Sequence, residues 1–217
     1  IDKNKKEKIF KKLNLSNEDF LILFVGRIAE EKNIKFLIEA HKKLINDDKK
    51  YKLVIVGDGP DVKNLKEASK DIKGNVIFAG KSPWEDVPCY YDMADVFVTA
   101  SKSETQGLTV LEALASSTPV VCANDPSYID AILPGTNGYV FDTEEEYIKN
   151  IKKLKADENL RKDFAKNARE YSENFSALKY GERVLEVYNE TIKNHKSFKD
   201  KYIEKEMIGK SKWKNYI

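Results

Sequence analysis

Short apolar runs, several of them ending in glycine, recur along the first two thirds of the chain and restrict its fold more than any other feature. They are FLILFVG at 20–26, YKLVIVG at 51–57, NVIFAG at 75–80, ADVFVTA at 94–100, TPVVCA at 118–123 and GYVF at 138–141. Strands without polar alternation are typical of parallel sheets covered on both faces. Helical segments separate the runs, so the sequence predicts an α/β fold: a Rossmann-like, doubly wound parallel sheet of about six strands with helices on both faces.

The pattern changes at both ends of this region. Residues 4–13 form a predicted short basic helix, and only helices follow Thr143, at about 143–155, 158–172 and 177–194. We therefore expect three parts: a connecting segment at 1–15, one α/β domain at 16–194 and a polar tail at 195–217.

The charge balance and cysteine content exclude several classes of protein. Lys and Arg number 38 against 36 Asp and Glu, a net charge of +2, which argues against a nucleic-acid partner. Cys89 and Cys122 are far apart in apolar surroundings, as in proteins of a reducing compartment. No apolar run approaches the roughly 18 residues that a membrane span needs. We expect a cytoplasmic protein.

Ligands of doubly wound sheets bind beyond the carboxyl ends of the strands, so the loops that follow the strands are the candidate sites. The GDGPDV loop is similar to a dinucleotide-binding fingerprint, but Val62 stands where the third glycine should be. A tight turn into a helix explains this loop better, and an NAD-dependent dehydrogenase is disfavoured.

Arg27 and Lys32 in the loop GRIAEEK follow the first strand. Two cations at the carboxyl end of a strand can hold a diphosphate, Arg through its planar fork and Lys as a point charge. Pairing with Glu30 and Glu31 at the surface is the alternative.

The stretch SETQGLTVLEALA carries the strongest signal. Gly107 is predicted to begin a helix, whose first amides form a natural anion site. Glu104 and Glu112 lie on either side, and eight helical residues span about 12 Å. One carboxylate could hold a sugar and the other a ribose, with phosphates between them. A loop glutamate and a helix glutamate in solvent are the alternative.

Together, GRxxxxK, VGDGP, NVIFAGK and E-x7-E on successive strands resemble the nucleotide-sugar-binding half of retaining glycosyltransferases with the two-domain GT-B fold. Residues 83–115 are similar to bacterial glycolipid synthases that transfer glucose from UDP-glucose to diacylglycerol. The resemblance covers about residues 15–192, and ANDPSYIDAI at 123–132 departs from the family pattern.

The resemblance implies a set of donor contacts. These are Gly26, Arg27, Lys32, Gly57, Gly59, Gly80, Lys81, Glu104, Gln106, Gly107, Leu108 and Glu112. Arg27 and Lys32 would bind the diphosphate, Glu104 the sugar and Glu112 the ribose, while Gly80 and Lys81 would border the uracil. Arg27, Lys32 and Glu104 are then the catalytic residues.

The resemblance also implies transfer of a hexose with retention of configuration, and neither a catalytic metal nor a cofactor. The acceptor, a lipid or a glycan, would bind a missing N-terminal domain, with the protein peripheral on the inner face of the cell membrane. The tail, which mixes lysines and aromatic residues, could lie on lipid or be a solvated terminus. Three alternatives stay open: a capsule or lipopolysaccharide acceptor, a non-catalytic nucleotide-sugar module, and a UDP-sugar 2-epimerase.

Several aromatic residues are expected to be structural. Trp84 should pack the third loop, while Tyr90, Tyr91 and Met93 fit a helix face that covers the sheet. His41 sits in an amphipathic helix and is not expected to act as a base or a metal ligand.

Overall fold

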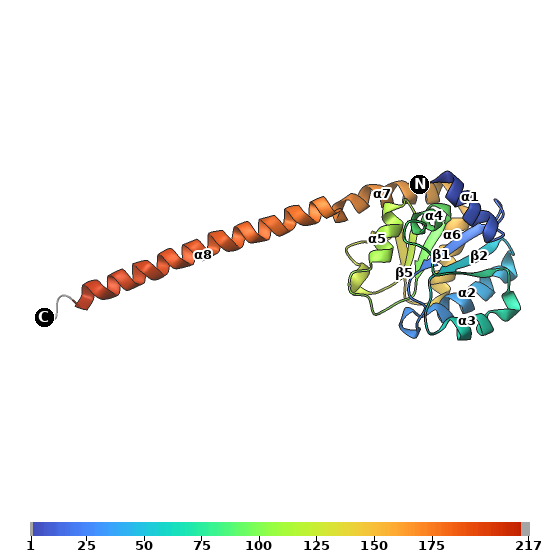
Figure 1. The fold of residues 1–217 in the computed structure, drawn as a ribbon, viewed down its shortest axis with the longest axis horizontal. Helices are drawn as coiled ribbons and strands as arrows, with labels where there is room; N and C mark the ends of the chain where they lie inside the picture. The colour runs from blue at the N-terminus through green and yellow to red at the C-terminus, as the bar shows by residue number, and fades with distance from the viewer. Residues whose placement is uncertain (1, 214–217) are drawn as a thin grey trace. The chain divides into compact units, whose positions relative to one another are not determined.

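A computed structural model describes residues 2–213 of the chain and the side chains of residues 2–195. Its centre is a six-stranded parallel sheet in the order β3-β2-β1-β4-β5-β6 (Figure 1). The strands are β1 (Phe20–Val25), β2 (Tyr51–Val56), β3 (Val76–Gly80), β4 (Val96–Thr99), β5 (Val120–Ala123) and β6 (Gly138–Phe141). All six predicted strands are confirmed. Because the order reverses between β1 and β4, a crevice is expected beyond their carboxyl ends.

Helices cover both faces of the sheet, as the sequence predicts. They are α1 (Lys3–Lys12), α2 (Ile34–Asp47), α3 (Val62–Ala68), α4 (Val87–Met93), α5 (Leu108–Ala115), α6 (Glu144–Ala156) and α7 (Glu158–Ser172). Helix α2 contacts α3 and α6, whereas α4 contacts α1 and α5, and α5 contacts α7. Two helix layers result, with the sheet between them (Figure 1), and the contact of α6 with α7 connects the two layers.

Strand β1 shows why the continuous apolar runs form the centre of the sheet. Ile22 and Phe24 belong to the core on the side of α2 and α6. Leu21 and Leu23 alternate with them and line a small space together with Tyr90 of α4. Burying a side chain of this size contributes about 1.5–3 kcal/mol, so polar residues are disfavoured at every position of such a strand.

The chain divides into two compact units, one ending at Glu173 and the other beginning at Asn174. The second unit holds the last helix, α8 (Ala177–Trp213). The predicted end of this helix at 194 is wrong, because the helix continues without a break to Trp213. The domain boundaries at 15 and 194 stay predictions, as does the role of the 195–217 tail, of which residues 214–217 lie outside the described residues.

No helix among residues 2–213 combines the length and the apolar character needed to cross a membrane.

Candidate functional site

A pocket of about 260 Å³ lies at the carboxyl ends of β1 and β4, where the strand order reverses. Its lining residues are Phe24, Val25, Gly26, Arg27, Lys32, Thr99, Glu104, Thr105, Gln106, Gly107, Leu108 and Thr109. Seven of the twelve predicted donor contacts are among them. The topology thus brings the GRIAEEK loop and the SETQG loop to one cavity, although they are about 75 residues apart in sequence.

Lys32 and Glu104 form an ion pair inside this pocket. A short 3₁₀ turn at Glu30–Lys32 brings Lys32 to the mouth of the cavity. Its Nζ lies 2.5 Å from Glu104 Oε1, and the two side chains are only 19% and 21% exposed. Partial burial strengthens such a pair relative to one in open solvent. The charges balance each other, and an anion entering the pocket would compete with Glu104 for the hydrogen bond that Lys32 donates.

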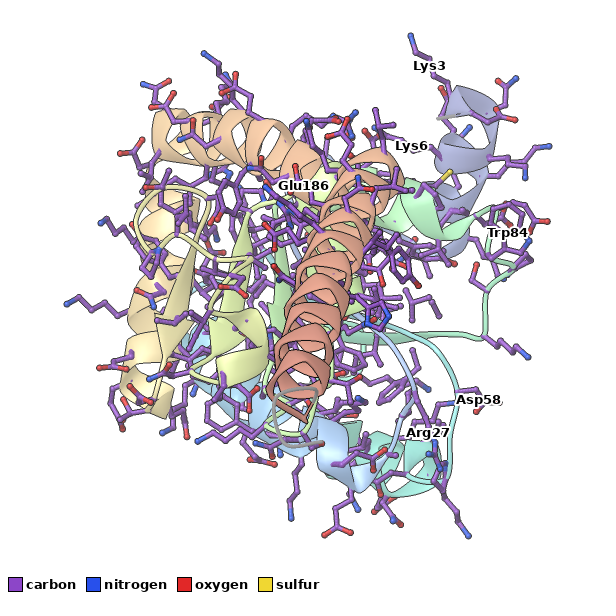
Figure 2. All side chains as sticks on the ribbon, turned by 90° about the vertical axis from the view of Figure 1, so that its left-hand side faces the viewer. Lys3, Lys6, Arg27, Asp58, Trp84 and Glu186 are labelled. Carbon is purple, nitrogen blue, oxygen red and sulfur yellow. The ribbon has the colours of Figure 1, made fainter. Side chains whose placement is uncertain are left out.

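Arg27 belongs to the pocket wall, but its side chain is 67% exposed and lies at the outside of the molecule (Figure 2). Its nearest ionic partner is Glu31, with NH1 3.8 Å from Oε1. Exposed pairs of this kind contribute about 0–1 kcal/mol. The pairing considered as an alternative from the sequence therefore exists, but it is too weak to hold Arg27 away from a ligand.

The start of α5 opens into the same pocket. Gly107 is the N-cap, with a left-handed φ of 57°, and no side chain caps the helix. The amides of Leu108 and Thr109 find no acceptor among the described residues. The positive end of the helix dipole is thus free to bind an anion. A side chain at Gly107 would come within 2.9 Å of the Tyr128 ring, which explains the glycine.

Glu112 does not line the pocket but lies one helical turn further along α5. Its Oε2 accepts a hydrogen bond from the Tyr91 hydroxyl at 2.9 Å. The same hydroxyl is 3.2 Å from the carbonyl of Thr109, a residue of the pocket wall. Tyr91 was expected to be structural only. The sequence does not single out Tyr91, because another tyrosine, Tyr90, stands beside it. Both are buried in the structure.

Gly57 and Gly59 serve a contact between two loops. A β-carbon at Gly57 would lie 1.8 Å from the carbonyl oxygen of Gly26, and one at Gly59 would lie 2.1 Å from that of Ile28. Ile28 N also donates to Asp58 O at 2.9 Å. These glycines let the loop after β2 pack directly on the loop after β1. Their predicted contact with a donor stays a prediction.

Gly80 and Lys81 are exposed at the end of β3 and do not line the pocket. Their predicted place beside a base is not tested. Trp84 follows in the same loop and is 80% exposed, at the outside of the molecule (Figure 2). The prediction that Trp84 packs this loop is therefore wrong. Its carbonyl accepts a hydrogen bond from Val87 N, but its indole ring stays in solvent.

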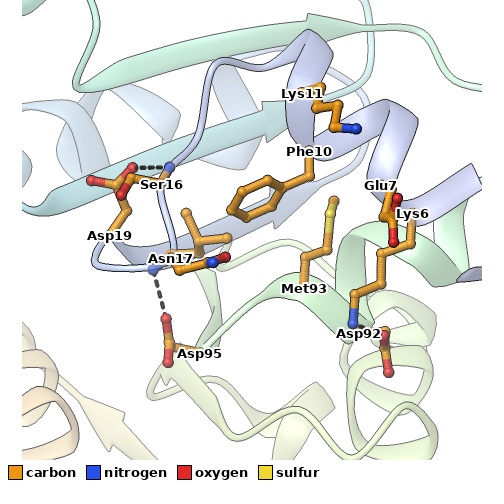
Figure 3. A pocket seen from close by; sticks show the side chains of 11 residues that line it. Lys6, Glu7, Phe10, Lys11, Ser16, Asn17, Asp19, Asp92, Met93 and Asp95 are labelled. Carbon is orange, nitrogen blue, oxygen red and sulfur yellow. Dashed lines mark hydrogen bonds and ion pairs between the residues drawn. The ribbon is translucent and has the colours of Figure 1, made fainter. Parts of the chain in front are cut away.

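A second pocket, of about 380 Å³, lies at the opposite ends of the strands, between α1 and α4 (Figure 3). Three of its acidic groups, Asp19, Asp92 and Asp95, already have partners. Lys6 Nζ is 2.6 Å from Asp92 Oδ2, and Asp95 Oδ2 accepts from Leu21 N at 2.8 Å. Burial raises the pKa of Asp95. Among the described residues, no group of three His, Cys, Asp or Glu side chains could hold a metal ion.

Two curated relatives are similar to this chain over most of its length. The alpha-monoglucosyldiacylglycerol synthase of Acholeplasma laidlawii is 34% identical over 197 residues, which cover 88% of this chain and 48% of the relative. The protein of the same name from Streptococcus pneumoniae is 34% identical over 191 residues, 87% of this chain and 43% of the relative. The chain thus spans about half the length of the curated relatives that it matches.

The fold matches a solved structure. Anabaena Alr3699/HepE, crystallised in complex with UDP, superposes with a TM-score of 0.78 at 21% identity, covering 88% of this chain and 54% of that one. Finally, the family model for glycosyl transferases group 1 matches residues 5–171, which include every residue of the pocket at the ends of β1 and β4. This chain belongs to the glycosyl transferases group 1 family.

Proposed function

We propose that this chain is the donor-binding half of a retaining glycosyltransferase that moves glucose from UDP-glucose to a lipid acceptor such as diacylglycerol. The observation that carries the proposal is the pocket in which a Lys–Glu pair faces an uncapped helix start. Family membership supports glycosyl transfer, and the two synthase relatives support the lipid acceptor. The structural relative that holds UDP supports the nucleotide.

We propose one orientation for the donor in this pocket. The diphosphate lies over the amides of Leu108 and Thr109, where the helix dipole favours negative charge. Lys32 exchanges its Glu104 partner for a phosphate oxygen. Glu104 is thereby released to accept hydrogen bonds from sugar hydroxyls, while Glu112 accepts those of the ribose.

Transfer breaks the bond between the anomeric carbon and the β-phosphate oxygen, and the electron pair stays on the departing UDP. Arg27, Lys32 and the helix amides stabilise that charge as preorganised donors. Loss of one such donor typically costs about 2.7–4 kcal/mol in the barrier. These groups belong to the chain itself, so we propose that no metal or cofactor is needed.

The acceptor would enter from a second domain, as in other two-domain enzymes of this architecture. We propose that the reaction takes place at a membrane surface, because a diacylglycerol acceptor resides in the bilayer. The pocket itself contains donor-binding groups only, so the transfer to an acceptor is proposed for the whole protein.

Calorimetric titration of the chain with UDP, UDP-glucose, GDP and ADP, with EDTA present, tests the donor site. We expect UDP and UDP-glucose to bind in preference to the purine nucleotides. Glu112→Ala should weaken UDP roughly tenfold or more, since hydrogen bonds to a charged group contribute about 1.5–3 kcal/mol. Glu170→Ala, an exposed change in α7, is the matched control and should leave binding unchanged.

Binding of UDP that is equal in Glu112→Ala and the original chain would contradict the ribose assignment. If no nucleotide binds, either to the chain or to a protein that joins it to the acceptor domain, the proposed function is wrong. If the nucleotide does bind, product analysis of the two-domain protein with diacylglycerol and with oligosaccharide acceptors would identify the acceptor. Conversion of UDP-sugar without any acceptor would instead identify an epimerase.

A further inference from the structure

A buried tyrosine outside the pocket touches the carboxylate to which the proposed function gives the ribose. The Tyr91 side chain extends from α4, and its hydroxyl lies 2.9 Å from Glu112 Oε2 on α5. Tyr91 is 1% exposed, whereas Glu112 is an exposed residue. A hydroxyl from the interior thus reaches outward to a surface carboxylate.

The position of this hydroxyl is fixed by the core. The Tyr91 ring packs against Phe97 of β4 with centroids 5.6 Å apart. Its backbone carbonyl accepts a hydrogen bond from the Thr118 hydroxyl at 2.9 Å. A ring packed in the core on a fixed backbone has little rotameric freedom, so its hydroxyl is held in place.

The Tyr91 hydroxyl acts as a donor to this carboxylate. Burial, with the Glu112 charge beside it, raises the pKa of Tyr91, which keeps the proton on the phenol at physiological pH. Two acceptors lie within reach, Glu112 Oε2 at 2.9 Å and Thr109 O at 3.2 Å. The ionised and closer carboxylate is the stronger acceptor.

The contact directs Glu112 toward the pocket. Side chains on a helix lean toward its N-terminus, so the Glu112 carboxylate lies back over the first turn of α5. The Tyr91 hydroxyl contacts both Glu112 and Thr109, and Thr109 belongs to the pocket wall. The Glu112 carboxylate therefore lies on the pocket side of its helix turn. The remaining oxygen, Oε1, has no partner among the described residues and is free to bind a ligand.

We propose that Tyr91 is a positioning residue for the nucleotide, which holds the Glu112 carboxylate in the orientation that accepts the two vicinal hydroxyls of the ribose. The inference rests on the proposed function. A free glutamate on a helix surface samples several rotamers and loses that freedom when it binds a ligand. Tyr91 removes this freedom before the nucleotide arrives, so the site binds ribose more tightly than a mobile glutamate would.

The test compares two nucleotides across three single variants and one double variant, by calorimetry on the 217-residue chain. The probes are UDP and 2′,3′-dideoxy-UDP, which lacks both hydroxyls that Glu112 would hold. Tyr91→Phe keeps the ring and removes only the hydroxyl, and Glu112→Ala removes the carboxylate. Tyr90→Phe is the matched control, because Tyr90 is a buried neighbour whose hydroxyl contacts no partner among the described residues.

We expect Tyr91→Phe to raise the Kd of UDP roughly three- to tenfold and that of the dideoxy nucleotide by less than about twofold. The preference for UDP should therefore shrink in this variant and stay intact in Tyr90→Phe. In the double variant with Glu112→Ala, the loss of the tyrosine hydroxyl should have no further effect on UDP binding.

Equal loss of both nucleotides in Tyr91→Phe would overturn the inference, because damage to the fold weakens both alike. The inference is also overturned if UDP binding depends on Glu112 but not on the tyrosine hydroxyl, in which case the proposed function stands. If the original chain, or its two-domain form, binds neither nucleotide, the proposed function fails as well.

Discussion

His41 carries an ionisable imidazole into the middle of the fold. Its side chain is fully buried in α2, and Nε2 donates to the carbonyl of Asn75 at 3.0 Å. Nδ1 has no partner among the described residues. Burial lowers the pKa of His41 to about 4, with the nearby Lys52 charge acting in the same direction. As the sequence suggested, this histidine is structural, but the same burial makes stability depend on pH.

The unfolded chain takes up a proton at His41 below about pH 6.5, whereas the folded chain resists until about pH 4. The stability that comes from the neutral imidazole is therefore complete above pH 6.5 and decreases as pH falls toward 4. At pH 5 the loss should be about 2 kcal/mol. Urea unfolding at pH 7 and pH 5 would measure it, with His41→Gln losing less stability than the original chain by this amount. The exposed His195, changed to Gln, is the control, and equal pH dependence in all three proteins would contradict the assignment.

Single residues also mark the limit of prediction from the sequence. Lys32 and Glu104 were identified because cations and carboxylates at strand ends suggest ligand chemistry, and both line the pocket. Tyr91 was missed as a contact of Glu112. Its part depends on how α4 packs beside α5, and a partner 21 residues away leaves no periodic trace in the sequence. Trp84 was predicted wrongly because nothing in the sequence distinguishes an exposed aromatic residue after proline from a buried one.

At the scale of elements, two loops are joined by backbone alone. Ile28 N donates to Asp58 O at 2.9 Å, and Asp61 N donates to Ile28 O at 3.2 Å. No side chain separates the 26–28 and 57–61 segments at Gly57, whose φ is 141°. The sequence predicted a tight turn into a helix at this place, but not its partner, since non-local backbone contact has no residue signature beyond glycine.

Gly57→Ala should cost roughly 2–5 kcal/mol in unfolding free energy, because the positive φ and the clash with the Gly26 carbonyl act together. Gly74→Ala separates the two effects: its φ is 99°, but nothing lies within 4 Å of the added carbon. Denaturant unfolding of both variants would measure the difference. Equal losses would mean that the loops can move apart without cost.

The elements differ in how well the sequence located them. Continuous apolar runs placed all six strands, because a strand covered on both faces excludes polar residues. The end of α8 was placed wrongly, since residues 195–208 contain neither Gly nor Pro to mark it and their charged residues are as compatible with a solvated helix as with a coil.

At the scale of the whole molecule, the unit that ends at Glu173 contains the complete sheet, the pocket and the Tyr91–Glu112 contact. A chain truncated after Glu173 should therefore fold and bind UDP with a Kd within about twofold of the 217-residue chain. Circular dichroism and calorimetric titration would test this. Loss of folding or of binding would show that residues from Asn174 onward contribute to the first unit.

The contact between the 26–28 and 57–61 segments also limits how such a chain can change over generations. The main chain at Gly26 and Ile28 lies against Gly57 and Gly59, so neither of these two glycines can gain a side chain without displacing that main chain. Under the proposed function, selection for a new donor sugar would then act on exposed positions of the pocket wall, such as Thr105 and Gln106. Divergent descendants should keep the two glycine segments nearly constant while the loops after β3 and β4 change in length and composition.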